Sequence, residues 1–153
     1  MKNSKKGFTL VELLAVIVVL AIIMIIAVPS VMDSMNNARK GAFRVYAQKV
    51  LTTAETKHQA TVLNGNDNVA NYCTQLTTLM GENTGSYDGY AVVCGGNTDH
   101  TRYFVSIKDN NFSYDKKDYN SVSADPENAS ELTSVTCPSG NDLADYCSSA
   151  IGS

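Results

Sequence analysis

The sequence predicts an α+β protein in which a long N-terminal helix packs on a small antiparallel β-sheet, followed by a disulfide-bounded, loop-rich C-terminal region. A nearly unbroken apolar run, residues 8–28, leads into a segment with apolar residues at helical spacing. Short apolar segments separated by turn-forming residues lie between about residues 89 and 115, as in a β-meander. All four cysteines lie at or after Cys73, which suggests disulfides in an exported domain.

The apolar run is the first element. At about 20 residues it is long enough for a helix to cross a bilayer of roughly 30 Å. Basic residues precede it at Lys2, Lys5 and Lys6, so the N-terminus should stay cytoplasmic and the remainder should be exported. Glu12 is the one charged side chain within the run. A carboxylate inside a membrane span is costly and therefore indicates a functional role.

Three interpretations of this stretch compete. It is an ordinary signal-anchor helix with an incidental glutamate, a cleaved secretory signal, or a segment retained after a shorter leader is removed. The cleaved signal fits poorly, because the run exceeds the usual apolar length and no small-x-small site follows it before Pro29.

Residues 5–12, Lys-Lys-Gly-Phe-Thr-Leu-Val-Glu, resemble the prepilin signature of type IV pilins and pseudopilins. The resemblance implies that a prepilin peptidase removes leader residues 1–7 by cutting between Gly7 and Phe8, and that Phe8 is then N-methylated. It also implies that Glu12 pairs with the N-terminal ammonium of a neighbouring subunit, which turns a buried charge into a paired one. Phe8, Glu12 and Pro29 are thus the expected assembly residues.

The function implied by the resemblance is that of a structural subunit of a type IV pilus filament, used for adhesion, motility or DNA uptake. The expected partners are copies of the chain, a prepilin peptidase, an assembly ATPase, an inner-membrane platform protein and, before assembly, membrane lipid. The precursor would cross the plasma membrane once, and the mature chain would lie in a cell-surface filament. A pseudopilin of a type II secretion or competence machine is the alternative, and a membrane-anchored binding domain that never polymerises is the second.

The helix should continue past the membrane. We divide it into a membrane and filament-core half, residues 8–29, and an amphipathic half, residues 30–63, with the globular head at 64–153. The turn-forming residues 64–67 end it. Leu20-Ala21-Ile22 replaces a glycine that many relatives have before the proline, so we expect only a short unwound stretch before Pro29 in filaments. One face of the amphipathic half is apolar at helical spacing and should pack on the head: Phe43, Ala47, Val50, Leu51, Ala54 and His58.

The head should contain a short helix, three strands and a long tail. The helix is expected over 73–80 and should end at Gly81; the strands are expected over 90–94, 103–107 and 112–114, with turns at 95–99 and 109–111. In the tail we also expect a fourth strand over 132–136 and one helical turn over 142–147. Four cysteines allow three pairings. The most local pairing, which we expect, is Cys73–Cys94 with Cys137–Cys147.

Charge is unevenly distributed. Residues 33–57 hold five basic and two acidic side chains, a formal net charge of +3, whereas residues from 58 onward hold four basic and twelve acidic ones, a net −8. Opposite charges at two ends of a subunit favour head-to-tail contacts in a filament. Arg39, Lys40 and Arg44 are the expected filament charge contacts, or could meet anionic lipid before assembly.

Catalytic patterns are absent from the sequence. It has no phosphate-binding glycine loop, nucleophile elbow or zinc-protease motif, and its cysteines lack C-x-x-C spacing. With only His58 and His100, a histidine-based metal or general-base site is not expected. We therefore expect no enzyme activity, metal or cofactor, and the acidic head disfavours specific nucleic-acid binding.

Overall fold

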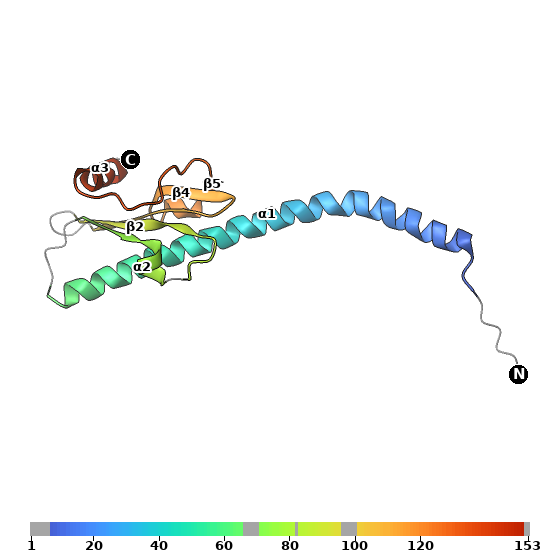
Figure 1. The fold of residues 1–153 in the computed structure, drawn as a ribbon, viewed down its shortest axis with the longest axis horizontal. Helices are drawn as coiled ribbons and strands as arrows, with labels where there is room; N and C mark the ends of the chain where they lie inside the picture. The colour runs from blue at the N-terminus through green and yellow to red at the C-terminus, as the bar shows by residue number, and fades with distance from the viewer. Residues whose placement is uncertain (1–6, 66–70, 82, 96–100, 152–153) are drawn as a thin grey trace, which may run out of the picture. The chain divides into compact units, whose positions relative to one another are not determined.

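The structure is a computed structural model, and it describes residues 7–65, 71–81, 83–95 and 101–151. The chain divides into two compact units, an N-terminal unit, Met1–Arg39, and a second unit, Lys40–Ser153. From here on we call the second unit the head; it contains the part of α1 after Arg39 as well as the predicted globular residues 64–153. In chain order the elements are α1 (Leu10–Leu63), β1 (Tyr72–Gln75), α2 (Leu76–Met80), β2 (Asp88–Cys94), β3 (Arg102–Lys108), β4 (Phe112–Lys117), the 3₁₀ helix η1 (Ser121–Ser123), β5 (Glu127–Asn128) and α3 (Asn141–Ile151) (Figure 1).

The sheet is an antiparallel meander with strand order β1-β2-β3-β4-β5. The three predicted strands are confirmed as β2, β3 and β4, each longer by two or three residues. The turn predicted between β3 and β4 is also present: the Asp109 carboxylate accepts the backbone N–H groups of Asn111 and Phe112, each at 2.7 Å. Two further strands, β1 and β5, extend the meander at its two edges.

Helices cover both faces of the sheet (Figure 1). The part of α1 within the head packs with Ala91, Val105 and Ile107 in one core, while α3 packs with Val92 and Phe104 in a second. Successive strand residues point to opposite faces. Central strand β2 is consequently buried along all but its first residue, because it supplies side chains to both cores.

The predicted helix face is confirmed: all six of its residues are buried, including His58. Phe43 lies 5.2 Å from Tyr114 between ring centres. The Tyr114 hydroxyl group lies within hydrogen-bonding distance of the carbonyl oxygens of Val122 and Ala124, at 3.0 and 2.7 Å. The apolar face of α1 is thereby tied, through one buried tyrosine, to the segment that carries η1.

Helix α1 continues through Pro29 in the single chain. Proline has no N–H group, so the carbonyl oxygen of Ile25 receives no hydrogen bond from it. The backbone is helical on both sides nevertheless, and the unwound stretch expected before Pro29 is not formed in the isolated subunit. For the assembled filament, that stretch stays a prediction. The helix ends at Leu63, and Gly65, with φ of +84°, donates to the carbonyl of Val62 at 3.0 Å.

Three predicted elements of the head are wrong in extent or type. The short helix begins at Leu76 rather than Cys73, because the preceding residues pair with β2 as strand β1. It ends at Met80, directly before the predicted stop at Gly81, whose φ is +93°. The tail helix α3 is eleven residues long rather than one turn. Residues 132–136 form no strand. The Gln75 side chain holds this stretch instead, donating to the Val135 carbonyl at 2.7 Å and accepting from the Cys137 N–H at 3.2 Å.

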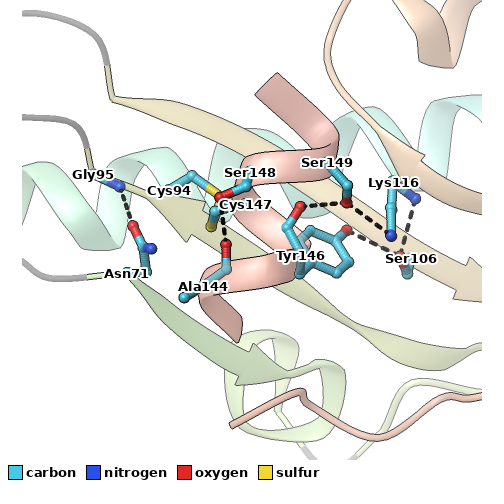
Figure 2. Close-up of a disulfide and its surroundings, with 10 residues drawn as sticks. All are labelled: Asn71, Cys94, Gly95, Ser106, Lys116, Ala144, Tyr146, Cys147, Ser148 and Ser149. Atoms are coloured by element: carbon cyan, nitrogen blue, oxygen red, sulfur yellow. Dashed lines mark hydrogen bonds between the residues drawn. A yellow bond between two sulfur atoms is a disulfide. The ribbon is translucent and has the colours of Figure 1, made fainter. Parts of the chain in front are cut away.

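The predicted disulfide pairing is wrong. The bridges join Cys73 to Cys137 and Cys94 to Cys147, with Cα separations of 5.6 and 5.5 Å. The strand register explains the correction. Cys73 lies opposite Val92, so Cys94 is its diagonal neighbour, and side chains so placed are about 7–8 Å apart, too far for a disulfide. Each of these cysteines therefore bonds to the C-terminal segment that passes over the same face, as Figure 2 shows for Cys94–Cys147.

Several predictions fall on residues outside those that the structure describes. These are leader residues 1–6, turn residues 66–67 and 96–99, and His100.

Disulfide mapping tests the crossed pairing. Trypsin releases Cys73 and Cys94 together on peptide 58–102, and Cys137 and Cys147 together on peptide 118–153. We expect these two peptides to remain linked without reductant in mass spectrometry, because both bridges run between them. Further cleavage before Asp88 and Asp142 should leave one species with Cys73 joined to Cys137 and another with Cys94 joined to Cys147. Two unlinked tryptic peptides would instead establish the local pairing.

Candidate functional site

Within the N-terminal unit, the segment of residues 13–28 presents apolar side chains on every side of the helix. All residues from Gly7 to Arg39 are exposed, and residues 13–28 include no charged side chain. Helix α1 is long and apolar enough at this end to cross a membrane. A soluble surface helix has a polar side and an apolar one. This segment has no polar side, so its surroundings must be apolar all round, either lipid or protein.

Thr9 and Glu12 form a reciprocal cap at the start of α1. The Glu12 carboxylate oxygen Oε2 accepts the backbone N–H and the hydroxyl group of Thr9, each at 2.8 Å, and the Glu12 N–H donates to Thr9 Oγ1 at 3.3 Å. The first N–H groups of a helix have no partner within it. A capping box, Ser or Thr followed three residues later by Glu, satisfies two of them.

This cap was missed in the sequence, although Thr9-Leu10-Val11-Glu12 has the required T-x-x-E spacing. The structure adds a partner within the same chain. Both bonds use Oε2, and among the described residues none donates to Oε1. A carboxylate has about four acceptor sites, so the cap leaves capacity for a second donor.

Gly7 and Phe8 precede the helix, which begins at Leu10. Phe8 is 91% exposed, and a Cβ placed on Gly7 would meet no atom within 4 Å. The peptide bond between them is therefore open to an enzyme. Gly7, Phe8 and Glu12, predicted as processing and assembly residues, lie together at this end of the chain, whereas Pro29 lies further along α1.

The predicted charge contacts divide into two groups. Lys40 and Arg44 form ion pairs with Asp125, in the loop before β5, at 3.4 and 2.9 Å. The Asp125 side chain is 69% exposed, so these pairs contribute at most about 1 kcal/mol. Arg39 is exposed. The three residues do not form one free basic cluster, because two already have an acidic partner within the head.

The comparison with known proteins finds a match at the same end of the chain. Residues 2–28 match the family model of the prokaryotic N-terminal methylation motif. No curated protein and no solved structure matched the chain. The motif is a pilin-type signature and supports a prepilin-like precursor, as in type IV pilins and pseudopilins. It covers the leader after Met1 and the whole apolar run, and it says nothing of the head.

The cap can be tested through hydrogen exchange in detergent micelles. Replacing Thr9 with valine removes the hydroxyl group that accepts from Glu12, at a cost of about 1 kcal/mol. We expect the Glu12 amide to exchange about fivefold faster, while the amide of Val50 in the head is unchanged. Equal exchange at Glu12 in both proteins would show that the cap does not stabilise the start of α1.

Proposed function

We propose that this protein is a structural subunit of a type IV pilus filament, assembled from processed precursors that the membrane holds. One observation carries the proposal: the methylation motif lies at the start of a helix segment that is apolar on all sides and exposed. Such a surface is stable in lipid, and it is also stable when copies of the same segment pack together. A filament core provides the second environment.

The precursor would cross the plasma membrane once, with residues 1–7 cytoplasmic and the head exported. A prepilin peptidase would cut between Gly7 and Phe8, a bond that the exposed, non-helical backbone leaves accessible. N-methylation of Phe8 would follow. The apolar segment stays on the mature chain, unlike a secretory signal, and the two disulfides suit an exported head.

Assembly would exchange lipid contacts for helix contacts. Lipid is as apolar as the helix surface, so the hydrophobic effect does not drive the exchange, and packing and polar pairing must do so. Extraction from the membrane then requires work from outside the chain. An assembly ATPase and an inner-membrane platform protein are the proposed sources.

Glu12 would supply the polar pairing. In the single chain Oε2 caps the helix, and no described residue donates to Oε1. We infer that Oε1 accepts the N-terminal ammonium of a neighbouring Phe8. The same carboxylate then serves both roles at once, and a neighbour placed one residue out of register would leave two charges unpaired in an apolar core, at large cost.

Charge would add to contacts between heads. Arg39 is exposed, so it can meet an acidic residue of a neighbouring head. Lys40 and Arg44 would do so while keeping Asp125 as a shared partner. A pseudopilin of a secretion or competence machine has the same N-terminal design. The loop-rich C-terminal segment, held by two disulfides, favours a displayed filament.

Two matched substitutions separate pairing from capping. Glu12→Gln keeps a side chain that can cap but removes the charge, whereas Thr9→Val keeps the charge and weakens the cap. We expect both variants to insert in the membrane, and filaments sheared from cells to be lost or sparse only for Glu12→Gln. Normal filament yield from Glu12→Gln would refute the pairing role. Loss in both variants would show that filaments need the cap as well as the charge of Glu12.

Processing is tested by Gly7→Leu. The side chain would obstruct close approach of the peptidase to the backbone. We expect an uncut precursor in the membrane fraction, with the intact mass of residues 1–153 and no N-methyl group, and no filaments. A mature mass beginning at a methylated Phe8 would contradict the proposed cleavage. Filaments made mainly of this chain would identify a major pilin, whereas short periplasmic or wall-spanning fibres alone would identify a pseudopilin.

A further inference from the structure

In the part of the head that follows α1, most basic side chains line one cleft. From residue 58 onward the chain has four basic residues against twelve acidic ones. Three of the four, Arg102, Lys116 and Lys117, line a cleft of about 320 Å³, with Asp118 and Ser121 beside them. Phe104 and Ala150 supply apolar wall from β3 and α3. A cationic cleft in an acidic head runs against the surrounding charge, which suggests a ligand rather than general solubility.

A β-bulge brings the two lysines to the same cleft. Val105 pairs with Lys117 and Ile107 with Tyr114, so β4 has one more residue than β3 between these pairs. Lys116 occupies the bulge with φ of +49° and is the one non-glycine residue with positive φ in the described parts of the chain. Neighbours on a regular strand point to opposite faces. Here Lys116 and Lys117 both line the cleft, and strained residues of this kind concentrate at functional sites.

A buried polar network holds the bulge (Figure 2). The buried Ser106 hydroxyl group donates to the Asp115 carboxylate at 2.7 Å and accepts the backbone N–H of Lys116 at 3.1 Å. Because that hydroxyl group has one hydrogen, the Tyr146 hydroxyl group, 3.1 Å away, must be the donor to Ser106. Burial raises the pKa of Tyr146, which keeps it protonated as a donor. The conformation of Lys116 is thus fixed by side chains from β3, β4 and α3.

The cleft retains unused positive charge. Lys116 Nζ donates to Ser149 Oγ at 3.0 Å and lies 4.9 Å from the Tyr146 ring centre, contacts that position the ammonium without neutralising it. Of the three cations, only Lys117 forms an ion pair with a described residue, Glu127, at 3.1 Å. Arg102 is exposed. Arg has five donors and Lys has three, so most donors remain available to a ligand.

The carboxylate that lines the cleft, Asp118, already accepts hydrogen bonds from within the head. Asp118 Oδ1 accepts both the hydroxyl group and the backbone N–H of Ser121, the latter at 2.9 Å. These bonds, the Ser121 hydroxyl bond most, and the nearby positive charge of Arg102 lower the pKa of Asp118, so Asp118 stays ionised. Its charge limits the cleft to a small excess of positive charge. That excess suits one anionic group and not a chain of phosphates, which the acidic head would repel.

We propose that this cleft binds a small molecule through a compact oxyanion, a carboxylate, sulfate or phosphate, held between Arg102 and Lys116. Its volume lies at the lower end of the range for ligand pockets, about 300–1,000 Å³. Charged donors form the stronger hydrogen bonds to such groups, and Arg can bind an oxyanion through two parallel N–H bonds. The apolar wall from Phe104 and Ala150 can contact the body of an organic ligand.

Binding is measured on the full chain in a nonionic detergent, by amide NMR shifts. The probes are inorganic phosphate, inorganic sulfate and glucuronate, with glucose as the neutral control. We expect an anion, and not glucose, to shift the amides of Lys116 and Ser121 in a saturable way. Preference for glucuronate would identify an acidic sugar, and preference for phosphate or sulfate an inorganic ion or its ester. If no anion shifts these amides at tens of millimolar, the proposal is overturned.

Matched variants assign the binding to the cleft. Arg102→Gln and Lys116→Gln should each weaken anion binding about tenfold or more, the loss expected for a charge-assisted bond. Lys108→Gln is the control, because Lys108 is the fourth basic residue of this region and lies at the other end of β3. Equal weakening by Lys108→Gln would show attraction by net charge alone and would overturn the cleft as the site. Thermal unfolding of each variant confirms that it is folded.

Discussion

The head depends on burying both faces of its sheet. Strands β2 and β3 carry apolar side chains on both sides, so one covering helix is insufficient. Helix α1 supplies a continuous stripe for one face. The other face is covered by α3, which buries only Tyr146, Cys147 and Ala150 and follows a loop-rich segment with little core of its own. Two disulfides, each joining the C-terminal segment to β1 or β2, hold that weaker layer in place.

Helix α1 meets two different environments within one continuous element. Its C-terminal part needs a single apolar stripe because water contacts the remainder, whereas its N-terminal part has no side suited to water. Polar and charged residues reappear after the apolar run, first at Ser30 and Asp33, and the second compact unit begins at Lys40. At the opposite end, the Thr9–Glu12 cap completes the helix just where the apolar run starts. A charged residue within that run is thus already part of the local structure before any second chain is present.

Buried Ser106 connects the two unusual features of the sheet. In an apolar core its hydroxyl group would be costly without partners, and the bulge in β4 supplies them by turning Asp115 and the Lys116 N–H toward it. The same bulge places two lysines at one cleft. Tyr146 from α3 completes the network, so the weaker layer of the head also fixes the geometry of its basic cleft.

The sequence by itself determined what depends on nearby residues. The length of α1, its buried face, the three central strands and the turn at Asp109 all follow from spacing and turn chemistry, and the motif at residues 5–12 indicated Gly7, Phe8 and Glu12. The Thr9 cap was equally local and could have been predicted from its spacing. Only tertiary structure decided the disulfides, since strand register separates Cys73 from Cys94. Tertiary structure also determines three further features: the Arg44–Asp125 ion pair, the hydrogen bonds between the Gln75 side chain and the backbone of Val135 and Cys137, and the bulge at Lys116. Each of these joins residues far apart in the chain or depends on strand register, and local propensity contains no information about which distant segments pack together.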